Sequence, residues 1–146
     1  MKTHGKTYGG FYVSRIHQIC GRVFEKLLKK SNVDAFNGAQ GRILYVLWEH
    51  EKLSLSDVGK YTSLAKTTLT SMIDRMEESG LVRRTPDKED RRQVFISITE
   101  KAKKFRKKYD KISEEMNGIF YRGFGSEEIA RLEKMLERII ANLEEQ

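Results

Sequence analysis

The sequence is short of the features that mark secreted and membrane-spanning proteins. It contains one cysteine, Cys20, so an internal disulfide is excluded and a reducing compartment is favoured. Its longest apolar run is "ILYVLW" at residues 43–48, far below the ~20 residues that a membrane-spanning helix needs. The N-terminal "MKTHGKTYGG" lacks the apolar segment of a secretory signal. We therefore expect a cytoplasmic protein that binds no membrane.

Motifs of catalysis and cofactor binding are also scarce. The chain has no glycine-rich phosphate loop, and no lysine follows an acidic residue by two positions, so the acid-x-Lys pattern of nucleases is absent. His17 and Cys20 lie one helical turn apart, but two ligands do not make a structural zinc site. The sequence predicts no enzyme, no cofactor and no metal site.

Positive charge is concentrated in one third of the chain. The 146 residues carry a formal net charge of +7. Residues 60–111 contain 15 lysines and arginines against 8 acidic residues, whereas the other residues balance at 13 of each sign. A localised basic surface attracts polyanions, nucleic acid first and anionic membranes second. A merely solvated helix face also produces charge runs, so the choice needs further evidence.

Hydrophobic periodicity predicts a mainly helical fold. We expect helices over residues 11–30, 38–50, 55–61, 66–79, 100–118 and 126–143. Ser54 is expected to cap helix 55–61 and Ser126 to cap the last helix, whereas Ala65 offers no side-chain cap to helix 66–79.

Residues 81–99, "LVRRTPDKEDRRQVFISIT", change the apolar period from 3.6 to 2. They predict strands over 81–85 and 93–98, joined by a charged turn. Two helices separated by "TSLA" form a helix-turn-helix candidate, and a hairpin directly after it makes a winged helix. The expected fold class is therefore mainly α with a small β-hairpin.

Helix 66–79 and the hairpin turn both carry side chains that suit DNA. Short hydroxyls and cations fit base edges and phosphates in the major groove, and a basic turn fits the minor groove. Asp87 and Asp90 can cap turn amides or hold a guanidinium extended. Lys60 is expected to add a phosphate contact. The predicted DNA-binding residues are Lys66, Thr67, Thr68, Thr70, Ser71, Arg75, Arg83, Arg84, Lys88, Asp90, Arg91 and Arg92. A neutral helix face and a solvated turn are the simpler explanations of each feature taken alone.

Residues 65–102, "AKTTLTSMIDRMEESGLVRRTPDKEDRRQVFISITEKA", resemble the recognition helix and wing of the multiple-antibiotic-resistance regulator (MarR) family. The wing pattern D-x-x-D-x-R is present as Asp87, Asp90 and Arg92, and the resemblance covers roughly residues 11–145. It implies that Arg92 enters the minor groove and that Asp90 orients it. It also implies an obligate homodimer on a pseudo-palindromic operator.

The resemblance further implies a single domain over residues 1–146. Residues 11–37 and 100–146 are expected to form dimerisation helices, and residues 38–99 the winged-helix DNA-binding lobe. Wide apolar stripes on the terminal helices independently favour a dimer, although they could instead fold back on their own core. Two explanations of the basic run 101–111 stay open, a surface that faces DNA and the solvated side of a dimer helix, and the second is expected.

Proteins of the MarR family commonly release DNA when a small anionic or phenolic ligand enters a cleft beside the DNA-binding lobe. Tyr12, His17, Tyr45 and Trp48 are candidates to line such a cleft, although core packing explains them equally well. Cys20 is expected to be buried and inert. The expected function is a repressor that binds double-stranded DNA and is relieved by a ligand; the alternative is a winged-helix protein-interaction module without DNA binding.

Overall fold

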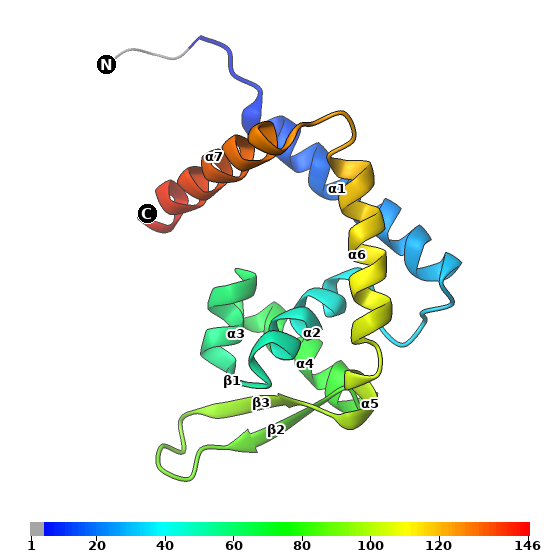
Figure 1. Cartoon of the computed structure of the whole chain (residues 1–146). Helices are drawn as coiled ribbons and strands as arrows, with labels where there is room; N and C mark the ends of the chain where they lie inside the picture. The colour runs from blue at the N-terminus through cyan, green and yellow to red at the C-terminus, as the bar shows by residue number, and fades with distance from the viewer. Residues whose placement is uncertain (1–4) are drawn as a thin grey trace. The chain divides into compact units, whose positions relative to one another are not determined.

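The computed structural model describes residues 5–146, so residues 1–4 of the stretch assessed for a secretory signal lie outside it. Within that range seven helices and three short strands form (Figure 1), which confirms the predicted fold class. The helices are α1 (Gly9–Lys30), α2 (Gly38–His50), α3 (Leu55–Thr62), α4 (Lys66–Glu78), α5 (Glu100–Lys103), α6 (Arg106–Phe120) and α7 (Ser126–Glu144). The strands are β1 (Lys52–Ser54), β2 (Val82–Pro86) and β3 (Val94–Ile98). The chain divides into two compact units, Met1–Ile112 and Ser113–Gln146.

Side-chain caps fix where α2 and α3 begin. The Asn37 side chain accepts the Gln40 backbone N–H at 2.8 Å, and the Gln40 side chain accepts the Asn37 N–H at 3.0 Å. Ser54 Oγ accepts the Asp57 N–H at 3.0 Å, which confirms the expected cap of α3. Each cap satisfies an amide that the first helical turn leaves without an intrahelical partner.

The expected cap of α7 is wrong by one residue. Ser126 is already the first helical residue, and Gly125 occupies the N-cap position. The Gly125 N–H donates to Glu128 Oε1 at 3.0 Å, so the first-turn acid binds the backbone of the N-cap residue, while no side chain caps the first helical amides. Such a contact needs no side chain at the cap position, which is why the sequence pattern pointed to the wrong residue.

The sheet has one strand more than the sequence predicts. Its antiparallel order is β1-β3-β2, with Lys52 opposite Ser97 and Ser54 opposite Phe95. β1 is three residues long and directly precedes α3, so it shows no alternation of its own. Strand β1 therefore ties the connection between α2 and α3 to the hairpin of β2 and β3.

The predicted helix over residues 100–118 is in fact two helices. The short α5 begins after Thr99, whose Oγ1 donates to the Gly80 carbonyl at 2.7 Å and accepts the Ala102 N–H at 3.2 Å. The turn between α5 and α6 places Phe105 against Phe36, with ring centroids 5.6 Å apart and planes nearly perpendicular. This packing against the first unit's core breaks the helix, and a periodicity argument cannot detect it.

An aromatic cluster lies at the centre of the first unit. Trp48 is 6% exposed, and its Nε1–H donates to the buried Ala102 carbonyl at 3.1 Å. Tyr109 packs against both Trp48 and Phe36, at centroid distances of 5.2 and 6.2 Å. Gly41 lies beside these rings, and a Cβ added there would stand 2.8 Å from Tyr109 Cε2. The close approach of α2 to α6 therefore depends on the missing side chain.

Helices α1 and α7 each carry apolar side chains that are exposed among the described residues. α7 has no buried residue, although its sequence stripe is continuous. The exposed apolar side chains on α1 include Phe11, Tyr12, Val13, Ile16 and Ile19, and those on α7 are Met135, Ile139, Ile140 and Leu143. Contiguous exposed apolar area of this kind is typical of an interface with another molecule.

Replacing Gly41 with alanine should destabilise the fold. The added methyl group overlaps the Tyr109 ring, and overpacking of a core costs about 1–3 kcal/mol. Urea unfolding should show this loss as a lower midpoint at unchanged slope. The matched control is Gly59→Ala, where a Cβ meets Leu69 Cδ2 at an ordinary 3.6 Å and should cause no loss. Equal stability of the two variants would contradict the assigned packing of α2 on α6.

Candidate nucleic-acid interface

Helix α4 buries one face and exposes the other. Leu69, Ile73 and Met76 are at most 2% exposed, and they hold the helix against the core of the first unit. Ser63, the C-cap of α3, has a left-handed conformation (φ +59°), and the chain then turns into α4. This is a helix-turn-helix, and its second helix is fixed in rotation by the buried stripe.

The opposite face of α4 carries the predicted hydroxyls and cations. Thr70 is half-buried, and the exposed members are Lys66, Thr67, Thr68, Ser71 and Arg75. Ala65 gives α4 no side-chain cap, as expected, so its first amides remain available to an outside acceptor. The helix therefore presents short donors and acceptors together with positive charge, which suits base edges and phosphates.

The turn of the hairpin is held by its own acidic residues, and the hairpin extends beyond the helices α2, α3 and α4 (Figure 1). Asp87 Oδ1 accepts the Glu89 N–H at 2.9 Å. Asp90 Oδ1 accepts both the backbone N–H and the Nε–H of Arg92, at 3.0 and 3.1 Å. The Arg92 side chain is nonetheless 91% exposed. The two geometric roles expected of these acids, capping and holding a guanidinium, are both present.

Arg84 does not point freely away from the protein. Its Nη2 lies 2.6 Å from Asp74 Oδ1 and its Nη1 lies 3.0 Å from Glu77 Oε1, both on α4. Its backbone N–H also donates to Glu77 Oε2 at 3.1 Å. Arg84 therefore links β2 to α4, a role that sequence reasoning missed because the partner acids precede it on another element. Arg83, Lys88 and Arg91 are exposed, and DNA contact by any of these arginines and lysines stays a prediction.

Much of the basic run 101–111 is used inside the protein. Lys101 Nζ donates to the Ser79 carbonyl at 2.8 Å, and Lys103 Nζ donates to Glu100 at 3.0 Å. Arg106 donates to the Trp48 carbonyl at 2.9 Å and to Glu49 at 3.0 Å. The contacts of Lys101 and Arg106 join α5 and α6 to neighbouring segments, and the expectation that this run is the solvated side of a dimer helix stays a prediction.

The four candidate ligand residues fall into two groups. Tyr45 and Trp48 both contact Tyr109, and Trp48 is buried with its indole N–H already used. Tyr12 and His17 are exposed on α1, where Tyr12 contacts the rings of Tyr8 and Phe11. No ring contact among residues 5–146 joins the two groups, and their ligand role stays a prediction. Cys20, also on α1, is half-buried rather than buried as expected.

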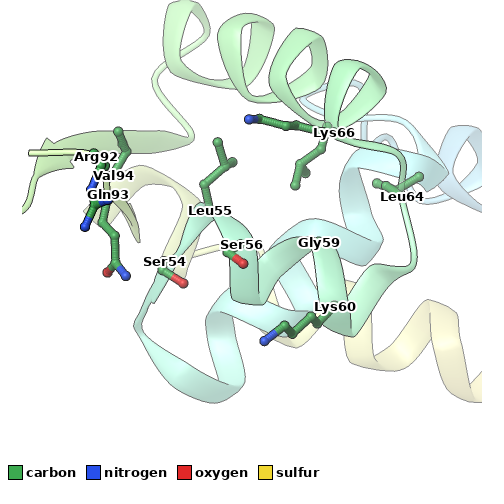
Figure 2. Close-up of a pocket in the computed structure, with 11 residues that line it drawn as sticks. Ser54, Leu55, Ser56, Gly59, Lys60, Leu64, Lys66, Arg92, Gln93 and Val94 are labelled. Carbon is green, nitrogen blue, oxygen red and sulfur yellow. The ribbon is translucent and has the colours of Figure 1, made fainter. Parts of the chain in front are cut away.

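A pocket of about 440 Å³ lies between α3, the start of α4 and the base of the wing (Figure 2). Its lining residues include Ser56, Gly59 and Gln93, which sequence reasoning missed because none of them stands out on its own element. Within the described part of the chain, no three His, Cys, Asp or Glu side chains cluster as a metal site would require. No helix there is long and apolar enough to cross a bilayer.

The hydrogen bonds from Arg92 to Asp90 predict a measurable shift in acidity. The side-chain bond, and then the backbone bond, hold the pKa of Asp90 below its ordinary value of 3.8. Removing the guanidinium in Arg92→Ala should raise that pKa, whereas Arg91→Ala should leave it low. Because the pKa of Asp90 is lower in the folded protein than its ordinary value of 3.8, the contact with Arg92 stabilises the folded state at pH values above 3.8. This stabilisation disappears as the pH falls through the pKa that Asp90 has in the folded protein. Carboxyl-detected NMR titration measures this directly, and an identical Asp90 pKa in wild type and Arg92→Ala would refute the pairing.

Comparison with known proteins places the chain in a family. The MarR family model matches residues 36–94. The HTH-type transcriptional regulator FarR of Neisseria gonorrhoeae is 30% identical over 113 residues, which are 77% of this chain and 71% of FarR. The HTH-type transcriptional repressor IacR of Pseudomonas putida is 29% identical over 92% of this chain and 78% of IacR. A mutant of Escherichia coli MarR complexed with operator DNA has the same fold, with a TM-score of 0.79 at 20% identity over 92% of this chain and 99% of that one. The chain therefore belongs to the MarR family of winged-helix transcriptional regulators.

Proposed function

We propose that this protein is a sequence-specific, DNA-binding transcriptional repressor that binds a pseudo-palindromic operator as a homodimer. The observation that carries the proposal is the wing tip, where Asp90 holds an almost fully exposed Arg92, in the same unit as the exposed hydroxyl face of α4. A preorganised arginine loses less conformational entropy when it enters a minor groove than a free one would. The names of FarR and IacR, a regulator and a repressor, support the same function.

In the proposed complex, some residues would provide sequence specificity and others would provide affinity. Thr67, Thr68 and Ser71 would meet base edges in the major groove, where hydroxyls serve as donors or acceptors. Arg92 would occupy the minor groove, where narrow A·T stretches concentrate negative potential. Phosphate contacts, which carry no sequence information, would come from the exposed cations Lys60, Lys66, Arg75, Arg83, Lys88 and Arg91. Arg84 would act through Asp74 and Glu77, by fixing the wing relative to α4.

The exposed faces of α1 and α7 support the homodimer. Ile140 is 51% exposed and Phe11 is 64% exposed in the single chain, which is costly for so many neighbouring apolar groups. A two-fold dimer would bury these faces against their copies and place two recognition helices ~34–36 Å apart, one turn of DNA. A regulator with this role would act in the cytoplasm and would perform no catalysis, and a small anionic or phenolic ligand would relieve repression.

A winged-helix module that binds only protein is the second candidate. Such a module would keep the exposed apolar faces of α1 and α7. It would have no need for an arginine held extended by an acid at the wing tip, nor for an exposed hydroxyl face on α4. Retention on heparin or bulk DNA across a salt gradient separates the two, because phosphate binding weakens steeply with salt.

Replacing Arg92 with alanine should weaken operator binding by ~1–3 kcal/mol and leave the fold unchanged. The measurement is fluorescence anisotropy with the DNA directly upstream of the protein's own coding region, over a salt series. Lys134→Ala is the matched control, because it also removes one exposed cation but from α7. Wild-type affinity in the Arg92 variant would refute the wing assignment. If neither the wild type nor the variants bind DNA at any salt while the protein is folded, the interaction module becomes the better explanation.

Replacing Ile140 with aspartate should convert the dimer into monomers. The side chain is half exposed in the single chain, so a charge there should harm the interface and not the fold of the protomer. Light scattering gives the mass, and circular dichroism checks the helix content. Lys134→Asp is the control, because residue 134 lies about 120° around α7 from residue 140, away from the apolar face. A dimeric Ile140→Asp protein would show that this face is covered in some other way.

A further inference from the structure

The first two turns of α4 carry three short hydroxyl side chains and one lysine at their exposed positions. Lys66, Thr67, Thr68 and Ser71 are exposed, whereas Leu69 lies buried in the core. In helix-turn-helix proteins, the N-terminal residues of the second helix are the ones that contact base edges in the major groove. If α4 binds DNA as proposed, these four side chains are therefore the ones that meet the bases.

This part of α4 has none of the side chains that recognise adenine or cytosine by hydrogen bonds. Asparagine and glutamine bind adenine through two hydrogen bonds, and aspartate and glutamate accept one from cytosine. The sequence contains no asparagine or glutamine between Gln40 and Gln93. Asp74 is the first acid of α4, and its carboxylate lies 2.6 Å from Arg84. Discrimination between bases would therefore come from the lysine and the hydroxyl-bearing side chains alone.

The hydroxyl groups discriminate poorly between bases. A hydroxyl is both a donor and an acceptor, so it fits the edge of any of the four bases. Among residues 5–146, the hydroxyls of Thr67 and Thr68 have no hydrogen-bond partner that would fix them as one or the other. The ammonium of Lys66 can bind guanine, but it can equally bind a phosphate.

The methyl groups of the two threonines are more selective. In the major groove, thymine is the only base that presents a methyl group, and the threonine methyl makes apolar contact with it. Thr67 and Thr68 are adjacent and lie about 100° apart around the helix, so their methyl groups face different directions and would meet different base pairs. The start of α4 therefore offers two separate apolar contacts to thymine.

We infer that Thr67 and Thr68 are specificity-determining residues that recognise thymine through their methyl groups. This inference rests on the proposed function, because it requires α4 in the major groove. The partner is then a duplex in which each half-site carries thymines next to the start of α4. The hydroxyls and Lys66 add affinity there without choosing the base.

The test begins with the sites that the full-length protein selects from random-sequence duplexes. Single thymines of a selected site are replaced by deoxyuridine in both half-sites, which removes the C5 methyl group and keeps every hydrogen-bonding atom. At each contacted position, fluorescence anisotropy should show a loss of roughly 16-fold, because one methyl group contributes about fourfold in each half-site. Thymines outside the contacted positions should show no loss.

Serine variants connect each methyl group of the DNA to one threonine. Thr67→Ser keeps the hydroxyl and removes the methyl group, so it should abolish the response to deoxyuridine at one position and retain it at the other. Thr68→Ser should show the opposite pattern, and each variant is thus the matched control for the other. Thr67→Val and Thr68→Val keep a methyl group but lose the hydroxyl, so both should keep the full response. Circular dichroism checks that all four variants are folded.

Several results would overturn the inference. These are selected sites without a thymine common to both half-sites, undiminished binding to every deoxyuridine duplex, or an unchanged deoxyuridine response in both serine variants. The last result would show that the methyl groups act through the shape of the DNA. A larger loss with 7-deazaadenine, which lacks the N7 acceptor, would assign recognition to the hydroxyls instead.

Failure of the inference and failure of the proposed function give different results. A folded wild-type protein that selects no duplex from the random pool would refute the proposed function, and the inference with it. Tight and sequence-selective binding that ignores deoxyuridine would overturn the inference alone and leave the proposed function standing.

Discussion

Arg84 joins the strand that leads into the wing to the helix that carries the hydroxyl face. Its guanidinium contacts Asp74 and Glu77 at 2.6 and 3.0 Å, and its backbone N–H uses the second oxygen of Glu77. Partly exposed ion pairs contribute only ~0–1 kcal/mol each to stability. Here the ion pairs act mainly on geometry. Asp74 and Glu77 together accept three contacts from Arg84, and these fix the orientation of the arginine. In the proposed function the wing and α4 approach DNA together, and this contact would fix the position of one relative to the other.

Helix positions follow closely from the sequence, because a buried stripe repeats with the helical period wherever packing is regular. α4 shows this best, since Leu69, Ile73 and Met76 are both its apolar pattern and its buried face. The errors arise where a distant segment decides the local structure. β1 exists because Phe95 and Ser97 on β3 offer it hydrogen-bond partners. The break before α6 exists because Phe105 packs on Phe36, and neither dependence leaves a local signal.

Some features of the candidate site could also be predicted from the sequence, and others could not. The contacts within the wing turn join residues two positions apart, so the roles of Asp87 and Asp90 could be predicted from spacing alone. Arg84 could not be separated from Arg83 by sequence, since both are arginines on one short strand. Only the alternation of β2 decides that Arg84 faces Glu77 while Arg83 remains exposed. The pocket could not be predicted from any local stretch of sequence, because α3, α4 and β3 each supply part of its lining.

A ligand that competed with DNA for the same side chains would lower DNA affinity without any change of protein conformation. If one molecule of such a ligand excludes DNA from a lobe, apparent DNA affinity falls by the factor 1 + [L]/Kd for that lobe. The size of this decrease in DNA affinity then depends on the ligand concentration and not on the free-energy difference between two protein states. A ligand in a cleft lined by Tyr12 or Tyr45 would have to shift the recognition helices instead, which requires different affinities for two arrangements of the dimer. The two modes therefore differ in their response to ligand: competition weakens the apparent DNA affinity further with each increase in ligand, whereas a shifted arrangement lowers it only to the finite affinity of the ligand-bound state.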